Sequence, residues 1–72
     1  MQAQDQIKEW CAKDGRKLGW IAAQVPVANS SLSRWMKGRV VPGQVYRHRL
    51  ADITGLDDIR SETSWIKEGD LS

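Results

Sequence analysis

The sequence is poor in the residues that build disulfides, metal centres and catalytic sites. Its 72 residues contain one cysteine, Cys11, and one histidine, His48. A single cysteine excludes an intramolecular disulfide and a cysteine-rich zinc site. His48 lies between Arg47 and Arg49 and no zinc motif surrounds it, so we expect a surface histidine and no metal ligand. No glycine-rich phosphate loop is present either. The sequence therefore predicts a protein that is not an enzyme and that needs no cofactor.

Long apolar runs are also absent. No segment approaches the roughly 20 apolar residues of a membrane span, and the first five residues lack the basic and then apolar pattern of a secretory signal. Together with the single cysteine, this favours the reducing cytoplasm of a bacterium or of a phage-infected host, with no membrane partner. A chain this short buries only about 60% of its unfolded surface. We expect one folded domain without a deep cleft and without a small-molecule ligand.

Acidic residues are missing from the middle of the chain. Between Arg16 and Arg49 there are seven basic residues and no acidic one, whereas all nine acidic residues lie in the two flanks. A surface that binds a polyanion needs such a segment, because a carboxylate near a phosphate repels it. A solvated face that merely lacks acids is the alternative.

Apolar residues recur with helical spacing throughout, and glycine and proline divide the chain into short pieces. We expect helices over about 3–14, 17–25, 29–37 and 43–54, with one more turn through Ile59. Gly15 and Gly55 suit the left-handed position just past a helix end. In the last helix, Tyr46, Leu50 and Ile53 are expected to face inward. The predicted fold is all-α: a compact bundle of four to five short helices.

The second and third expected helices form a helix-turn-helix, since about four residues join them. Leu32, Trp35 and Met36 form the inner face of the third helix. Its outer face is polar and free of acids, and consists of Asn29, Ser30, Ser33, Arg34 and Lys37. Amide, hydroxyl and guanidinium groups on a helix can read base edges in the major groove of DNA. A plain helical hairpin whose polar face meets only water is the alternative.

The spacing of these residues resembles that of the Cro and lambda-repressor-like helix-turn-helix proteins. The similar positions are Ile21-Ala22, Val25, Val27, the run Ser30–Trp35, Gly38, Pro42 and the run Arg49–Leu56. The resemblance covers roughly residues 5 to 60. It implies a DNA-binding domain over 1–60, followed by a C-terminal tail over 61–72.

The resemblance also implies roles for individual residues. The positions at which the family reads bases correspond to Asn29, Ser30, Ser33 and Arg34. The positions at which the family binds DNA phosphates correspond to Lys37 and Arg39. We also expect Lys17 and Arg47 to bind phosphate. Asn29 could instead cap its helix, because Ala28 at the cap position has no side-chain acceptor.

Three departures from the family pattern concern the turn and the core. Pro26 stands where the family usually has glycine, and proline cannot take a positive φ, so the turn must differ in detail. Leu18 replaces a polar residue that often touches phosphate. Cys11 and Met36 stand where many members have a basic and an acidic residue that pair across the core. Both are apolar here, which is consistent with hydrophobic packing in place of a buried ion pair.

The C-terminal tail carries apolar residues that are costly to leave in water. We expect Trp65 and Ile66, together with Ile59, to form a two-fold dimer contact. Trp20 lies off the apolar stripe of its helix, and three roles stay open for it: shielding the core edge, contacting phosphate, or meeting a second subunit.

These features predict a sequence-specific transcriptional regulator of phage or bacterial type. We expect a repressor that binds an inverted-repeat operator in double-stranded DNA as a homodimer, through the helix at about 29–37. One alternative is a protein-interaction adaptor, either antitoxin-like or a phage host-takeover factor. Another is an architectural or recombination accessory protein that bends DNA.

Overall fold

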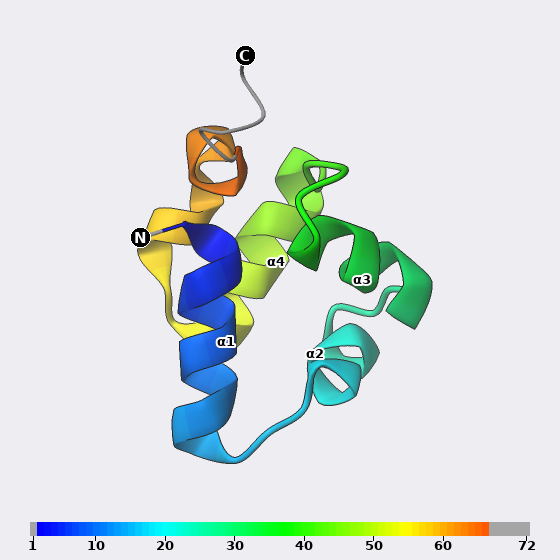
Figure 1. Ribbon diagram of the computed structural model, residues 1–72, viewed down its shortest axis with the longest axis vertical. Coiled ribbons are helices and arrows are strands. Elements are labelled where there is room, and N and C mark those ends of the chain that lie inside the picture. The colour runs from blue at the N-terminus through cyan, green and yellow to red at the C-terminus, as the bar shows by residue number, and fades with distance from the viewer. Residues whose placement is uncertain (1, 67–72) are drawn as a thin grey trace.

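A computed structural model describes residues 2–66, and all of its regular structure over that range is helical (Figure 1). The elements are α1 (Ala3–Asp14), α2 (Leu18–Gln24), α3 (Asn29–Met36), α4 (Gln44–Thr54) and two 3-10 turns, η1 (Asp57–Arg60) and η2 (Glu62–Trp65). The predicted all-α bundle is confirmed. Each α-helix begins and ends within one residue of the range expected from the sequence.

Two helices end at glycines, as their sequences predicted. Gly15 follows α1 with φ 66° and Gly55 follows α4 with φ 74°, both in the left-handed region. The Gly15 N–H donates to the Cys11 carbonyl and the Gly55 N–H to the Ala51 carbonyl. A residue with a Cβ is strained in this conformation, so glycine lets the chain leave each helix and turn back over the core.

The core is built mainly from the predicted inner faces of α1, α2 and α3. Its buried apolar residues are Ala3, Ile7, Ile21, Ala22, Val25, Leu32, Trp35, Met36, Leu50, Ala51, Ile59 and Trp65. Trp10, Cys11 and Leu18 are half-buried and pack against this cluster. Cys11 and Met36 therefore both contribute to apolar packing.

The inner face of α4 differs from the expected one. Tyr46 is 40% exposed and Ile53 is half-buried, whereas Ala51 and Thr54 are buried beside Leu50. Thr54 can be buried because its hydroxyl donates to the Leu50 carbonyl (2.8 Å) and accepts from the Leu56 N–H (3.3 Å). The expectation that Tyr46 points inward was wrong, because its ring instead lies beside Trp35 at the edge of the core, with ring centroids 5.3 Å apart.

The chain passes from α2 to α3 through residues 25–28. Figure 1 shows α2 nearly end-on while α3 runs across the view, so the two helices cross at a steep angle. The Val25–Pro26 peptide bond is cis, and no residue of this turn has a positive φ. The turn thus differs from a glycine turn, as Pro26 predicted. Arg49 of α4 holds it in place, because its Nη1 donates to the Val25 carbonyl (2.8 Å).

Residues 57–66 are part of the same folded unit. Trp65 is 1% exposed, and its indole N–H donates to the Ile59 carbonyl (2.8 Å). Gln4 of α1 is also buried, and its amide donates to the carbonyls of Trp65 and Trp35 (3.1 Å each). The predicted boundary at residue 60 is therefore wrong, since the domain extends at least to residue 66. The rest of the expected tail, 67–72, lies outside the described residues.

Candidate nucleic-acid interface

The outer face of α3 is polar and solvent-accessible, as the sequence predicted. Asn29, Ser30, Arg34 and Lys37 are exposed, and Ser33 is half-buried. On the opposite side of the helix, three large apolar residues anchor α3 in the core: Leu32, Trp35 and Met36. Because one face is fixed by burial, the other presents its polar side chains in a defined register.

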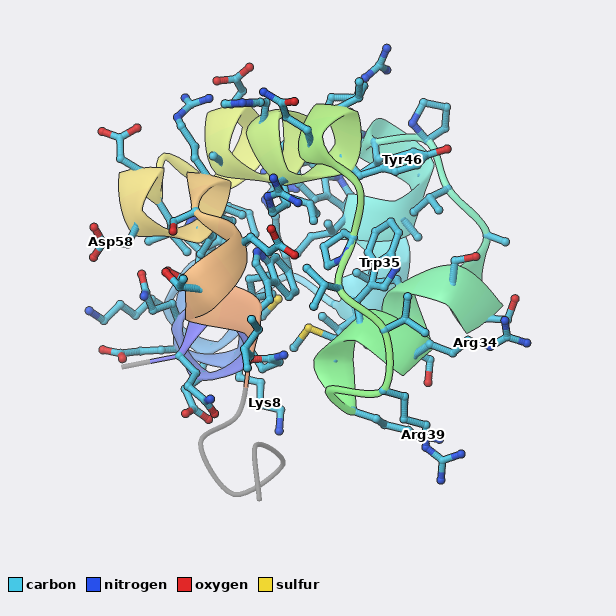
Figure 2. The ribbon with its side chains drawn as sticks, turned by 90° about the horizontal axis from the view of Figure 1, so that it is seen from above. Lys8, Arg34, Trp35, Arg39, Tyr46 and Asp58 are labelled. Atoms are coloured by element: carbon cyan, nitrogen blue, oxygen red, sulfur yellow. The ribbon has the colours of Figure 1, made fainter. Side chains whose placement is uncertain are left out.

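Arg34 is the longest side chain at the centre of this face. Figure 2 shows it pointing away from the body of the molecule, on the same side as Arg39. No ion pair within residues 2–66 engages either guanidinium, and both are exposed. Each can therefore offer its full set of N–H donors to an external acceptor.

Asn29 is the first residue of α3, and Ala28 is the N-cap. The start of α3 has no side-chain cap, and the exposed Asn29 side chain makes no such bond. Of the two roles predicted for Asn29, capping is wrong. Its amide remains available at the N-terminal end of the α3 outer face.

The predicted phosphate-binding residues fall into two groups. Lys17, Lys37 and Arg39 are exposed, and Lys17 directly precedes α2 while Lys37 directly follows α3. All three lie near an end of α2 or α3 in the chain. We call these three residues the flanking basic set.

Arg47 does not belong to this set. Its side chain is half-buried, with Nε donating to the Arg60 carbonyl (3.0 Å) and Nη1 to the Pro42 carbonyl (2.7 Å). These bonds tie α4 to η1 and to the connection that precedes α4. The prediction that Arg47 binds phosphate is corrected here, because its donors are engaged by the protein backbone.

Acidic side chains gather elsewhere. Asp52, Asp57 and Asp58 lie on α4 and η1, and Figure 2 shows Asp58 on the side away from Arg34 and Arg39. The ion pairs recorded in the described part of the chain are Lys13–Glu9, Arg60–Asp52 and Arg60–Asp57. All three involve residues outside the acid-free segment 16–49. The sequence asymmetry thus becomes a spatial one, with positive charge around α3.

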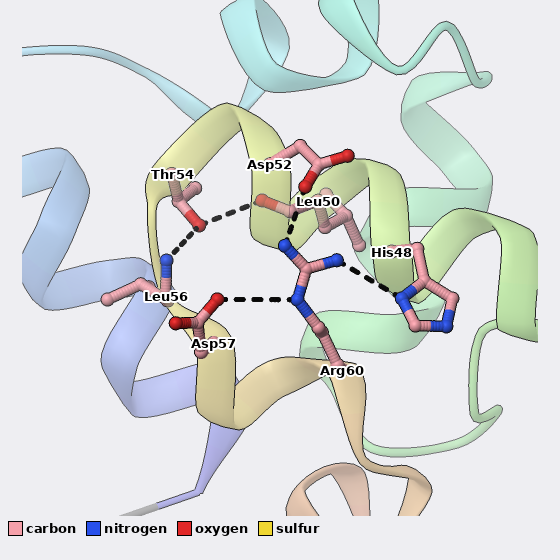
Figure 3. A network of polar contacts seen from close by, with 7 residues as sticks. All are labelled: His48, Leu50, Asp52, Thr54, Leu56, Asp57 and Arg60. Carbon is pink, nitrogen blue, oxygen red and sulfur yellow. Dashed lines mark hydrogen bonds and ion pairs between the residues drawn. The ribbon is translucent and has the colours of Figure 1, made fainter.

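Arg60 is the centre of the acidic end (Figure 3). Its guanidinium contacts Asp52 (2.6 Å), Asp57 (3.3 Å) and the Nδ1 atom of His48 (3.1 Å). An arginine can only donate, so Nδ1 of His48 is the acceptor. The hydrogen bond to Asp52 is the main cause that raises the pKa of Arg60, and Asp57 adds to it. His48 is thus engaged at this end of the molecule and not near α3.

Trp20 packs at the edge of the core on α2. Its ring lies 6.0 Å from that of Trp10, and the Arg16 guanidinium sits 4.1 Å above its centroid. This arrangement favours the first of the three roles considered, in which Trp20 shields the core. The cation–π contact also holds Arg16 near the start of α2.

The expected dimer contact is corrected by the burial of its main residues. Trp65 and Ile59 are 1% and 0% exposed, so neither can offer a surface to a second subunit. Ile66 is half-buried, and its carbonyl accepts from the Gln2 amide (2.7 Å). Isolated in sequence, these residues suggested an exposed apolar tail. In the fold, Trp65 and Ile59 belong to the hydrophobic core.

Sequence reasoning missed the polar residues that hold this scaffold together. Gln4 and Arg49 reach carbonyls that lie 24 or more residues away in sequence. Helical periodicity indicates which side faces the core, but it does not reveal which distant carbonyl a side chain will meet. The only local signal for Gln4 was its position next to Ala3, on the side of α1 that the apolar stripe marks as buried.

Two other classes of site, metal-binding and membrane-spanning, are not found in residues 2–66. No group of three or more histidine, cysteine or acidic side chains gathers there in a metal-binding arrangement. Within the same range, no helix has the length and apolar character needed to cross a bilayer. Comparison of the chain with protein-family models, with curated protein sequences and with solved structures finds no match.

Proposed function

We propose that this protein is a sequence-specific DNA-binding regulator of transcription that inserts α3 into the major groove. One observation carries the proposal. The outer face of α3 is exposed and acid-free, and its opposite face is fixed in the core. Among the other described helices, α1 and α4 contain acidic residues, and α2 contains no charged residue at all.

The dimensions and chemistry of α3 suit the major groove. An α-helix with its side chains is about 10–12 Å in diameter, close to the roughly 12 Å width of the groove. Arg34 can make a two-pronged contact with guanine, and the Asn29 amide matches adenine in the same way. Ser30 and Ser33 can donate to or accept from several bases. In this proposal these four residues read sequence.

The flanking basic set supplies the contacts that do not depend on sequence. Lys17, Lys37 and Arg39 bind phosphates on either side of the groove and fix the position of α3. Each phosphate contact releases counterions, so affinity falls steeply as salt rises. Arg47 takes no part, since its donors are engaged within the fold.

A dimer on an inverted repeat completes the proposal. Two copies would set their α3 helices in successive major grooves, roughly 34 Å apart. The contact between the copies involves neither Trp65 nor Ile59, which are buried within one chain. Repression follows when the bound dimer covers a promoter and excludes RNA polymerase.

The test is selection of bound duplexes from a random DNA pool at about 150 mM salt, followed by sequencing. We expect enrichment of an inverted repeat with half-sites about one helical turn apart. A folded protein that enriches no sequence would contradict the proposal and favour a protein partner or a non-specific architectural role.

Variants at Arg34 distinguish recognition of specific bases from non-specific electrostatic attraction to DNA. Arg34→Ala is expected to weaken operator binding by about 1–3 kcal/mol and to relax preference at one base position. Arg34→Lys keeps the charge but loses the planar fork. It should therefore retain affinity for random DNA while losing the same preference. Equal losses on operator and random DNA for Arg34→Ala would show that Arg34 does not read bases.

A further inference from the structure

A groove lies beside the proposed reading face, between α1, the first turn of α2 and α3. Its volume is about 450 Å³, within the range of about 300–1,000 Å³ typical of small-molecule sites. The half-buried Leu18 gives it an apolar wall, and the more deeply buried Met36 and Leu32 form its floor. No role has been given to this groove so far.

The charged residues that line the groove are both lysines. Lys8 comes from α1 and Lys37 directly follows α3, and no carboxylate of residues 2–66 lines the groove. An apolar lining with two ammonium groups complements a molecule with an apolar chain and one anionic head. We propose that this groove binds a medium-chain fatty carboxylate, with the carboxylate near the lysines and the chain against Leu18 and Met36.

Gly19 keeps the groove open at the start of α2. A Cβ at this position would meet only the Oδ1 atom of Asn29, at 3.9 Å. The backbone of Gly19 is helical without a positive φ, so a larger residue is tolerated there. A side chain added at residue 19 would therefore occupy the space assigned to the fatty chain.

The groove and the proposed DNA face share residues. Asn29, Ser33 and Lys37, spaced by four along α3, line the groove and also belong to the proposed reading and phosphate-binding residues. This step rests on the proposed function: a carboxylate bound beside Lys37 covers one edge of α3. The fatty carboxylate would then release the protein from DNA, which makes the groove an effector site.

Ligand binding is measured first without DNA. Methyl NMR spectra of the full chain are followed during titration with hexanoate, octanoate and decanoate, each below its aggregation concentration, and with 1-octanol. We expect shifts in the methyl signals of Leu18, Leu32 and Met36 but not of the core residue Ile59. Affinity should rise with chain length by up to about fourfold per buried methylene, and octanoate should bind more tightly than octanol.

Two pairs of variants locate the ligand. Gly19→Leu should abolish the octanoate shifts, whereas Gly19→Ala, which adds only a methyl group, should retain them. Lys8→Gln should weaken octanoate several-fold and leave octanol unchanged. The control is Lys13→Gln, on the same helix but ion-paired with Glu9 and not in the groove, and it should bind both ligands as the wild type does. Circular dichroism confirms that each variant is folded.

The DNA measurement keeps the two proposals distinguishable. Octanoate should weaken binding to the selected operator in the wild type and have no such effect on Gly19→Ile or Gly19→Leu protein that still binds DNA. Octanoate shifts that are absent, or that persist in folded Gly19→Leu, overturn the groove assignment while leaving DNA binding intact. Groove binding without any change in operator affinity overturns the effector role. If no operator is found, the regulator proposal fails and the NMR titration alone decides the ligand site.

Discussion

The arginines beside α3 and those at the α4–η1 end have the same chemistry and contrasting surroundings. Arg34 and Arg39 are exposed, with no ion pair in the described residues. Arg47 donates to two backbone carbonyls, and Arg60 contacts two carboxylates and a histidine ring. Arg34 and Arg39 are therefore available to an external acceptor, whereas Arg47 and Arg60 join elements of the fold.

This difference shows that the number of basic residues in a sequence segment overestimates how many of them are available to bind a polyanion. A guanidinium carries five donors, so a carbonyl or carboxylate brought close by folding will engage it. Arg47 lies within the acid-free segment, yet carbonyls replace the missing carboxylates. An acid-free segment thus favours a DNA-binding surface but does not by itself provide one.

The largest effect is expected from Trp65→Ala, which tests whether residues 57–66 belong to the structural end. Trp65 is buried and hydrogen-bonded, so truncation leaves a cavity and an unpaired carbonyl at Ile59. We expect a loss of about 3–5 kcal/mol in the free energy of unfolding, measured by urea denaturation. Trp20→Ala, at a half-buried site, should cost less. A loss below about 1 kcal/mol in the free energy of unfolding for Trp65→Ala would show that residues 57–66 do not contribute to the folded core.

The next prediction compares the two kinds of arginine directly. Arg47→Ala leaves the carbonyls of Arg60 and Pro42 without their donors and should lower the free energy of unfolding by about 1–2 kcal/mol. Arg34→Ala should change it by no more than about 0.5 kcal/mol, because the side chain is exposed. Thermal and urea unfolding of both variants measure this. Equal losses of unfolding free energy in the two variants would show that Arg47 stabilises the fold no more than the exposed Arg34 does.

A smaller effect is expected for the flanking basic set. Arg39→Ala should weaken binding to operator and random DNA alike, and should lower the slope of log affinity against log salt by about 1. The matched control is Lys13→Ala, since Lys13 pairs with Glu9 on α1 and should leave the slope unchanged. Titrations at several salt concentrations give the slope. A sequence-selective loss for Arg39→Ala would place Arg39 among the base readers instead.

The smallest effect extends the comparison to α1, where burial changes the chemistry of a side chain. Desolvation, with a further contribution from the Asp14 carboxylate, raises the pKa of the Cys11 thiol. Less reactive thiolate is then present at a given pH, so iodoacetamide should alkylate the folded protein more slowly than the urea-unfolded chain. The pH at which alkylation accelerates should also lie higher for the folded protein. Rates that match in the two states would show that Cys11 is not shielded.

Local features of the sequence predicted most of the secondary structure. Helix periodicity, Gly15 and Gly55 placed the α-helices to within a residue, because hydrogen bonding and backbone strain act over a few residues. The inner face of α3 was also correct, since its three large apolar residues share one side. The exposed positions of Ser30 and Arg34 follow from that face by geometry alone.

The burial of side chains that pack against other elements of the fold was not predictable in this way. Tyr46 looks apolar by periodicity, but Ala51 and Thr54 are buried on α4 in its place. Trp65 and Ile59 looked like an exposed patch because nothing nearby in sequence could cover them. Trp65 is covered by α1, whose Gln4 lies 61 residues earlier in the chain, and η1, which carries Ile59, packs mainly against α4.

The sequence alone determined the helices, the turn between α2 and α3, and the absence of acidic residues from the outer face of α3, because each depends on neighbouring residues or on composition. Only the tertiary structure decided which cations face solvent and which bind carbonyls, that residues 57–66 complete the core, and that a groove opens beside α3. These outcomes depend on distances between residues far apart in the chain, which chain folding sets and periodicity does not encode.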